Sequence, residues 1–184
     1  GFFLLPALGT HLSGVVLECL CILIAFLCLR NTGQFQRSLG VLGLVVLTCG
    51  VLELSHGIPG QIYRNKLPPE LRVLEVSEGV STNVMVSEHK KTGQRRLWLN
   101  SDWVAGTGGT HRALGHLPGL MVEKPNRILG IALGTGQTFA AALDHGATSL
   151  DCVEINSDVI SLSRKWFGEA NRGVLDSPKV NVHN

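Results

Sequence analysis

The stretch from Arg127 to Asn156 constrains the fold most strongly. An apolar run of strand length, Ile128 to Leu133, is interrupted by Gly134-Thr135-Gly136 immediately before a helix-compatible stretch. A second apolar run follows at 149–155 and carries Glu154 near its end. A strand, a glycine turn, a helix and a second strand in this order predict a βαβ unit, which is typical of a parallel sheet in an α/β protein.

The spacing of the glycine turn and Glu154 also predicts a ligand. In nucleotide-binding α/β folds, glycines let backbone N–H groups approach the ligand at the helix N-terminus, and an acid about 20 residues later accepts hydrogen bonds from ribose hydroxyls. The dinucleotide fingerprint requires a small residue where this chain has Phe139, so a pyrophosphate cofactor is disfavoured. The pattern favours an adenosyl ligand such as S-adenosylmethionine; the alternative is a plain strand-to-helix turn.

Further motifs accompany this unit, and together they resemble the spermidine/spermine synthases, which are polyamine aminopropyltransferases. The resemblance covers roughly 71–184 and is greatest to the bacterial branch in which this domain follows membrane-spanning helices. It rests on Ala105-Gly106-Thr107, His116-Leu117-Pro118, Ile128 to Gly136, Val153 to Asn156, Asp158 to Ile160 with Arg164, and Asp176 to Val180.

The resemblance implies a Rossmann-like sheet of the S-adenosylmethionine-methyltransferase type, of which this chain carries the first half. It implies a transferase that moves an aminopropyl group from decarboxylated S-adenosylmethionine to a small-molecule amine acceptor, without a metal. The residues expected to contact the donor are Gly134, Gly136 and Glu154, with Thr135 and Asn156 behind them. On the acceptor side, His111 is a weaker candidate.

Two departures from the family pattern concern the substrates. Where the family has Tyr-His-Glu, this chain has Thr110-His111-Arg112, which puts recognition of a cationic polyamine in doubt. Where the family has an aspartate that binds the amine end of the donor, this chain has the uncharged Thr135. Ordinary S-adenosylmethionine is therefore also a candidate donor. The alternatives are an S-adenosylmethionine-dependent methyltransferase and a non-catalytic domain that senses an adenosyl ligand for a membrane protein.

No residue is predicted to be the catalytic base. In the resembled fold the catalytic aspartate lies after the fourth strand, whereas this chain is expected to supply three strands. The carboxylates of Asp144 and Asp151 lie outside the expected pocket and that of Asp176 lies in a connecting turn, so their expected role is structural. With only part of the sheet, the chain is expected to expose an unpaired strand edge and an apolar face, and to behave poorly in isolation.

Apolar residues concentrate at the start of a chain that is 45% hydrophobic and has a mean hydropathy of +0.24. Residues 1–29 contain Glu18 and almost no other charge, and 38–52 contain none. Because a bilayer-spanning helix needs about 20 mainly apolar residues, about two transmembrane helices are predicted within 1–54. The alternatives are a signal peptide, whose basic start is missing here, and a pair of buried core helices.

This predicted segment leads to an expected location. Arg30 and Arg37 before the second helix, against Arg64, Lys66 and Arg72 after it, barely favour a cytoplasmic C-terminal domain. Adenosyl cofactors are cytosolic, so an inner or cell membrane location with the C-terminal domain in the cytoplasm is expected. The five cysteines include no Cys-x-x-Cys pair, so neither a zinc site nor a disulfide framework is indicated.

Residues 55–70 are rich in Gly and Pro and are predicted to be a linker. Alternating apolar and polar residues in 71–99 then predict a small antiparallel β-domain, 71–109, whose last part, 101–109, is expected to be a loop. The cofactor domain follows at 110–184. In the resembled family such a sheet contributes to oligomerisation, which implies a homo-oligomer.

A basic cluster in the β-domain raises the question of nucleic-acid binding. Its members are Lys90, Lys91, Arg95 and Arg96, and the only aromatic residue among them is the nearby Trp98. Since the net charge of the chain is only +2, a solvated hairpin is favoured and no nucleic-acid partner is expected.

Overall fold

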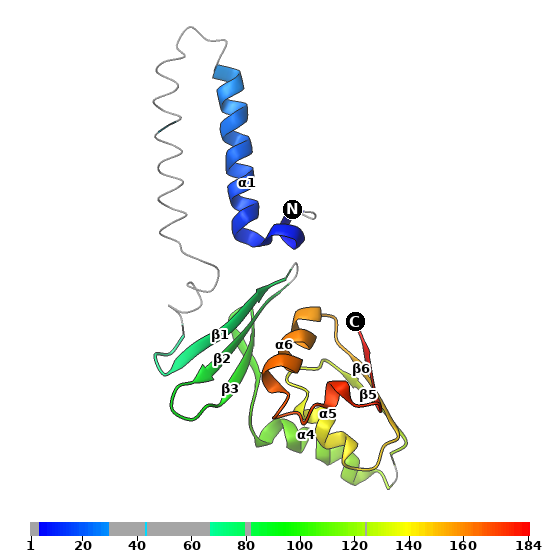
Figure 1. The fold of residues 1–184 in the computed structure, drawn as a ribbon. Coiled ribbons are helices and arrows are strands. Elements are labelled where there is room, and N and C mark those ends of the chain that lie inside the picture. Colours follow the sequence, from blue (N-terminus) through cyan, green and yellow to red (C-terminus); the bar gives the residue numbers. More distant parts are fainter. Residues whose placement is uncertain (1–3, 30–42, 44–66, 80–81, 124) are drawn as a thin grey trace. The chain divides into compact units, whose positions relative to one another are not determined.

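The computed structural model describes residues 4–29, 43, 67–79, 82–123 and 125–184, and the chain divides into two compact units, Gly1–Lys66 and Leu67–Asn184 (Figure 1). In the first unit, helix α1 runs over Leu4–Leu29. Within the described part of the chain, no helix has both the length and the apolar character needed to cross a bilayer. The prediction of a membrane span over 1–29 is therefore not supported, and the second predicted span lies outside the described residues apart from Gly43.

The second unit begins with an antiparallel sheet in the order β1-β2-β3-β4. Its strands are β1 (Leu71–Glu78), β2 (Asn83–His89), β3 (Arg95–Leu99) and β4 (Asp102–Gly106). The first three follow the alternating pattern of the sequence. The central position of β2 explains why Val84 and Val86 are fully buried.

Strand β4 corrects the prediction of a loop over 101–109. The chain reverses at Asn100, which has φ of 57°, and β4 then pairs with β3 so that Ala105 lies opposite Leu97. A Cβ atom at Gly106 would lie 3.0 Å from the Arg95 carbonyl oxygen. The small residues of this segment therefore serve close strand packing, which composition alone did not distinguish from a loop.

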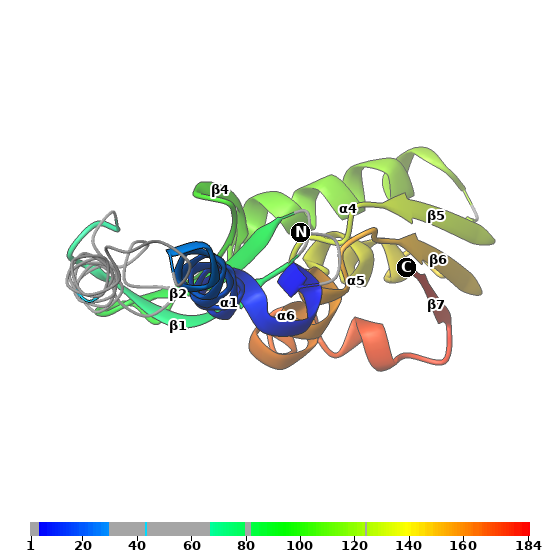
Figure 2. The ribbon, with the colours of Figure 1, turned by 90° about the horizontal axis from the view of Figure 1, so that it is seen from above.

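A parallel sheet in the order β5-β6-β7 follows, and it confirms the predicted βαβ unit. The elements in chain order are α4 (Gly109–Met121), β5 (Arg127–Ile131), α5 (Gln137–Leu143), β6 (Ser149–Val153), α6 (Ser157–Phe167), η1 (Val174–Asp176) and β7 (Val180–His183). Figure 2 shows the three strands side by side, with α4 and α5 next to β5. Both sheets contribute to one core, in which Val84 and Leu97 join Phe139 and Leu150.

Glycines allow the helices to approach closely. A Cβ atom at Gly115 of α4 would lie 2.2 Å from the carbonyl oxygen of Thr138, and one at Gly130 of β5 would lie 2.1 Å from the Phe139 ring. Both distances are too short for a side chain at these two positions. The backbone of α4 therefore packs against the backbone of α5, and the backbone of β5 packs against the Phe139 ring. This packing fixes both α4 and β5 against α5.

One face of the parallel sheet is left open. Leu129 and Ile131 of β5 are 67% and 75% exposed, and Ile155 after β6 is 94% exposed. In the described part of the chain, β5 and β7 each pair with β6 alone. The predicted unpaired edge and apolar face are therefore both present.

Candidate functional site

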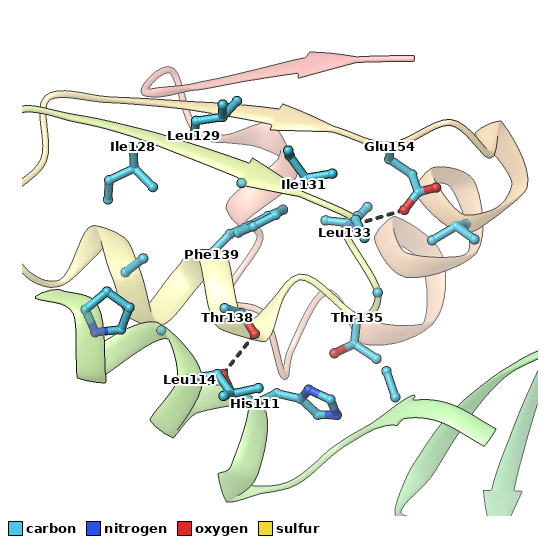
Figure 3. Close-up of a pocket in the computed structure, with 18 of the residues that line it drawn as sticks. His111, Leu114, Ile128, Leu129, Ile131, Leu133, Thr135, Thr138, Phe139 and Glu154 are labelled. Atoms are coloured by element: carbon cyan, nitrogen blue, oxygen red, sulfur yellow. Dashed lines mark hydrogen bonds between the residues drawn. The ribbon is translucent and has the colours of Figure 1, made fainter.

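A pocket of about 990 Å³ lies at the carboxyl ends of β5 and β6 (Figure 3). Its wall includes the glycine turn, defined as Gly134 to Gly136, through Gly134 and Thr135, and it includes Glu154 just after β6. The end of β4, helix α4 and helix α5 close the other sides. In an open α/β sheet, ligands bind at the carboxyl ends of strands next to such turns.

Glu154 is brought to the glycine turn by the register of the two strands. Ile131 lies opposite Val153, and the Ala132 N–H donates to the Val153 carbonyl at 2.9 Å. Glu154, the residue after β6, therefore faces Leu133. The Glu154 carboxylate accepts one hydrogen bond from the Leu133 N–H and one from the Asn156 N–H, both at 2.9 Å.

These two contacts hold the carboxylate rigid and leave it able to bind more. Glu154 is 8% exposed, and each of its oxygens has one backbone donor. An ionised carboxylate has about four lone-pair sites, so about two remain for a ligand. A pair of hydroxyl donors, such as the diol of a ribose, matches this arrangement.

The charge of Glu154 also affects its neighbour on β6. Burial, and secondly the negative charge of Glu154, raise the pKa of the Cys152 thiol to about 11. Cys152 is fully buried in the core and stays neutral at physiological pH. It therefore packs beneath the site and supplies no nucleophile.

The glycine turn adopts a backbone conformation that most residues avoid. Gly134 and Gly136 have φ of 56° and 79°, in the left-handed region that favours glycine. Ala132 just before the turn also has a positive φ, of 67°. The Gly136 N–H donates to the Leu133 carbonyl at 3.0 Å, which closes the turn. The predicted glycines are thus required by the backbone geometry.

Comparison with known families shows what the C-terminal part of the chain is similar to. Residues 108–184 match the sequence model of the family described as the spermine/spermidine synthase domain. The match covers less than half of the chain. A comparison with curated protein sequences gave no significant match.

Solved structures share the fold of part of this chain. The chain is similar to spermidine synthase from Thermotoga maritima and to a spermidine synthase crystallised with the transition state analogue AdoDATO, each with 22% identity and a TM-score of 0.56. Each match covers 61% of this chain. The chain spans about two fifths of those structures, 39% and 40% of their length.

The other predicted donor contacts are placed differently from Glu154. Thr135 lines the pocket but is 2% exposed, and its Oγ1 accepts a hydrogen bond from Gln137 Nε2 at 3.1 Å. Asn156 Oδ1 accepts from the Asp158 N–H at 2.9 Å, so Asn156 caps α6. The Asn171 side chain occupies the space beside Gly136, so this space is not open to a ligand.

His111 lies on the α4 side of the pocket, opposite β5 (Figure 3). The Thr138 hydroxyl donates to the His111 carbonyl at 2.9 Å and so ties this part of α4 to α5. His116 lies inside α4, and its Nδ1 is 3.1 Å from His145 Nε2. His111 is therefore placed for contact with a bound molecule, whereas His116 links α4 to the turn after α5.

Sequence reasoning missed the apolar wall of the pocket. Leu114 and Pro118 of α4, Val122 just after it, and Ile128 of β5 all line it. The four-residue spacing on α4 was the available signal, because such residues share one helix face. Among the described residues, no group of three or more His, Cys, Asp or Glu side chains is placed to hold a metal ion.

Proposed function

We propose that this chain belongs to an aminopropyltransferase that uses decarboxylated S-adenosylmethionine as donor and a small-molecule amine as acceptor. The observation that carries the proposal is the Glu154 carboxylate, fixed by two backbone N–H groups beside the glycine turn, inside the pocket of a spermine/spermidine synthase domain. The similar spermidine synthase that binds AdoDATO supports an adenosyl ligand in this fold.

The proposed reaction is a direct displacement. The lone pair of a neutral amine attacks the carbon attached to the sulfonium, the carbon–sulfur bond breaks, and the adenosyl thioether leaves with the electron pair. The product amine then loses a proton. The role of this chain is to bind and orient the adenosyl donor, which lowers the entropic part of the barrier.

A carboxylate that receives the proton is not assigned among the described residues. Glu154 is the single carboxylate of the described pocket wall, and its two oxygens already face backbone donors. Glu154 is therefore proposed as a binding residue, and His111 as a residue on the acceptor side.

One observation favours S-adenosylmethionine-dependent methyl transfer as the second candidate. The Thr135 hydroxyl is buried and accepts from Gln137, so the glycine turn offers no charge to the amino-acid end of a donor. A donor that keeps its carboxylate is then not repelled there. A non-catalytic domain that senses an adenosyl ligand is the third alternative, and it needs the same pocket.

The experiment incubates the purified full chain, and in parallel any longer form of the protein, with each donor and a set of amines. Product masses are read by mass spectrometry. A mass gain of one aminopropyl group on an amine supports the proposal, and a mass gain of one methyl group supports the second candidate. Binding of a donor without either product supports sensing, and no binding of either donor contradicts all three.

Location and assembly stay predictions from the sequence. A membrane location with the synthase domain in the cytoplasm, and a homo-oligomer, are tested by cell fractionation with protease protection and by light scattering of the purified protein. Recovery of the full chain in the soluble fraction contradicts the membrane prediction.

A further inference from the structure

Two buried side chains that do not line the pocket hold the glycine turn. The Ser163 hydroxyl on α6 donates to the Gly134 carbonyl, and Asn171 Nδ2 donates to the Thr135 carbonyl at 3.0 Å. Ser163 is fully buried and Asn171 is 1% exposed. Neither residue lines the pocket, whereas Gly134 and Thr135 do.

These contacts determine the direction of one backbone donor. In a trans peptide the carbonyl and the N–H of the same group point in opposite directions, and the described chain has no cis peptide. The Gly134 carbonyl and the Thr135 N–H belong to one peptide group. Because Ser163, which does not line the pocket, holds that carbonyl, the Thr135 N–H points away from Ser163, and Thr135 is one of the residues that line the pocket.

The Thr135 N–H has no acceptor among the residues that the structure describes. Its residue is nevertheless 2% exposed. The next N–H along the chain, that of Gly136, is paired with the Leu133 carbonyl at 3.0 Å. Buried backbone donors without a partner are rare in folded proteins, so one at the edge of a pocket points to a ligand atom as its acceptor.

The orientation of the Gly134–Thr135 peptide must be determined by contacts from outside the turn. Glycine reaches many backbone conformations at little cost, so local sterics do not determine the orientation of the Gly134–Thr135 peptide. A hydrogen bond from a side chain that is itself fixed in a helix supplies that orientation. Asn171 adds to it, since its Nδ2 would lie 3.1 Å from a Cβ atom at Gly136 and its Oδ1 accepts from the Gly173 N–H at 3.0 Å.

We propose that Ser163 is a positioning residue for ligand binding: it holds the Gly134–Thr135 peptide so that the Thr135 N–H donates a hydrogen bond to an acceptor atom of the adenosyl ligand. This inference rests on the proposed function, because that function supplies the ligand. Asn171 supports the following peptide in the same way. The ligand is thus bound by a carboxylate on one strand end and by a backbone donor on the other.

The same helix offers a matched control. The Ser161 hydroxyl donates to the Ser157 carbonyl at 2.9 Å, within α6, and Ser161 is exposed. Ser161→Ala and Ser163→Ala thus remove the same group from the same helix. Only the second removes a contact with the glycine turn.

The test is calorimetric titration of the purified full chain with 5′-methylthioadenosine, which carries the adenosyl thioether common to both donors. Ser163→Ala is expected to raise the Kd about fivefold to tenfold, in the range of one lost hydrogen bond, whereas Ser161→Ala is expected to leave it within about twofold. Thermal midpoints are recorded for both variants, so that a loss of folded protein is separated from a loss of affinity.

A second measurement uses the native sequence and needs no variant. On addition of 5′-methylthioadenosine, the amide proton of Thr135 is expected to shift downfield and to exchange more slowly with solvent. The inference is overturned if the native chain binds the compound and this amide does not respond, or if Ser163→Ala binds as tightly as native. Absence of binding by the native chain overturns the proposed function and the inference together.

Discussion

The two sheets of the second unit are attached to their neighbours in different ways. The antiparallel sheet is attached to α6 through polar side chains, since Arg95 donates to the Trp166 carbonyl at 2.6 Å and Glu75 pairs with Lys165 at 2.7 Å. The parallel sheet is attached to α4 and α5 through glycines that permit contact between backbones. A polar contact that is lost can be replaced by hydrogen bonds to water. An atom added to a space that is already filled has no such compensation. The second attachment should therefore tolerate substitution far less.

The largest expected effect is that of Gly115→Ala. The new methyl group would lie 2.2 Å from the Thr138 carbonyl oxygen and 2.8 Å from the Ala141 Cβ, so α4 must move away from α5. Overpacking of this kind costs about 1–3 kcal/mol, and a backbone obstacle favours the upper end. Urea unfolding measures the loss.

Gly109→Ala is the control on the same helix, because no atom lies within 4 Å of its added methyl group. It is expected to be neutral or slightly stabilising, since alanine favours helix more than glycine does. Equal unfolding midpoints for the two variants would mean that the helices do not depend on close approach at Gly115.

A smaller effect is expected when a polar contact within the antiparallel sheet is removed. The hydrogen bond from Arg72 to Glu88, at 2.8 Å, together with the nearby Arg95, holds the pKa of the Glu88 carboxyl below its usual value of 4.5. A lowered folded-state pKa stabilises the fold above pH 4.5, and this contribution is lost as the pH falls through the folded-state pKa.

Glu88→Gln is accordingly expected to lower stability at pH 6 by about 1 kcal/mol or less, as for partly exposed ion pairs, and to reduce the decline between pH 6 and pH 3. Urea unfolding at several pH values measures both. Glu169→Gln removes an exposed carboxylate of the same type and serves as control. A native-like pH profile in the Glu88 variant would show that this ion pair does not contribute.

The last and smallest expected effect concerns the core beneath the parallel sheet, and its measurement needs no mutation. Because burial raises the pKa of the Cys152 thiol to about 11, Cys152 is expected to resist a thiol reagent at pH 8 in the native chain. The exposed Cys19 and Cys21 should react much faster. Peptide mass spectrometry after timed labelling distinguishes these sites, and rapid labelling of Cys152 would show that the core opens readily.

The sequence pattern was sufficient to predict those parts of the structure that depend on residues close to one another in the sequence. The run before Gly134, the turn itself and the distance to Glu154 together specified the βαβ unit, because one crossover places both strand ends at the same edge. Strand β4 was missed because small residues are equally common in loops and in closely packed strands.

Contacts between residues that are far apart in the sequence could not be predicted from the sequence pattern. Ser163 meets the glycine turn across 29 residues of sequence, and Asn171 meets it across 36. Nothing local distinguishes Ser163 from Ser161, which lies two positions away and faces solvent. Similarly, the pairing of His116 with His145 depends on the crossing of α4 and α5. Such residues become visible only when the helices are placed.

The most direct measurement of the central claim is calorimetric titration of the full chain with S-adenosylmethionine and with its decarboxylated form, for the native sequence, Glu154→Gln and the control Glu169→Gln. Loss of a charged acceptor costs about 1.5–3 kcal/mol, so Glu154→Gln is expected to raise the Kd of the preferred donor about tenfold to a hundredfold. The control should bind like the native chain. Unchanged affinity in Glu154→Gln, with both variants folded, would contradict the assignment of this carboxylate to an adenosyl ligand.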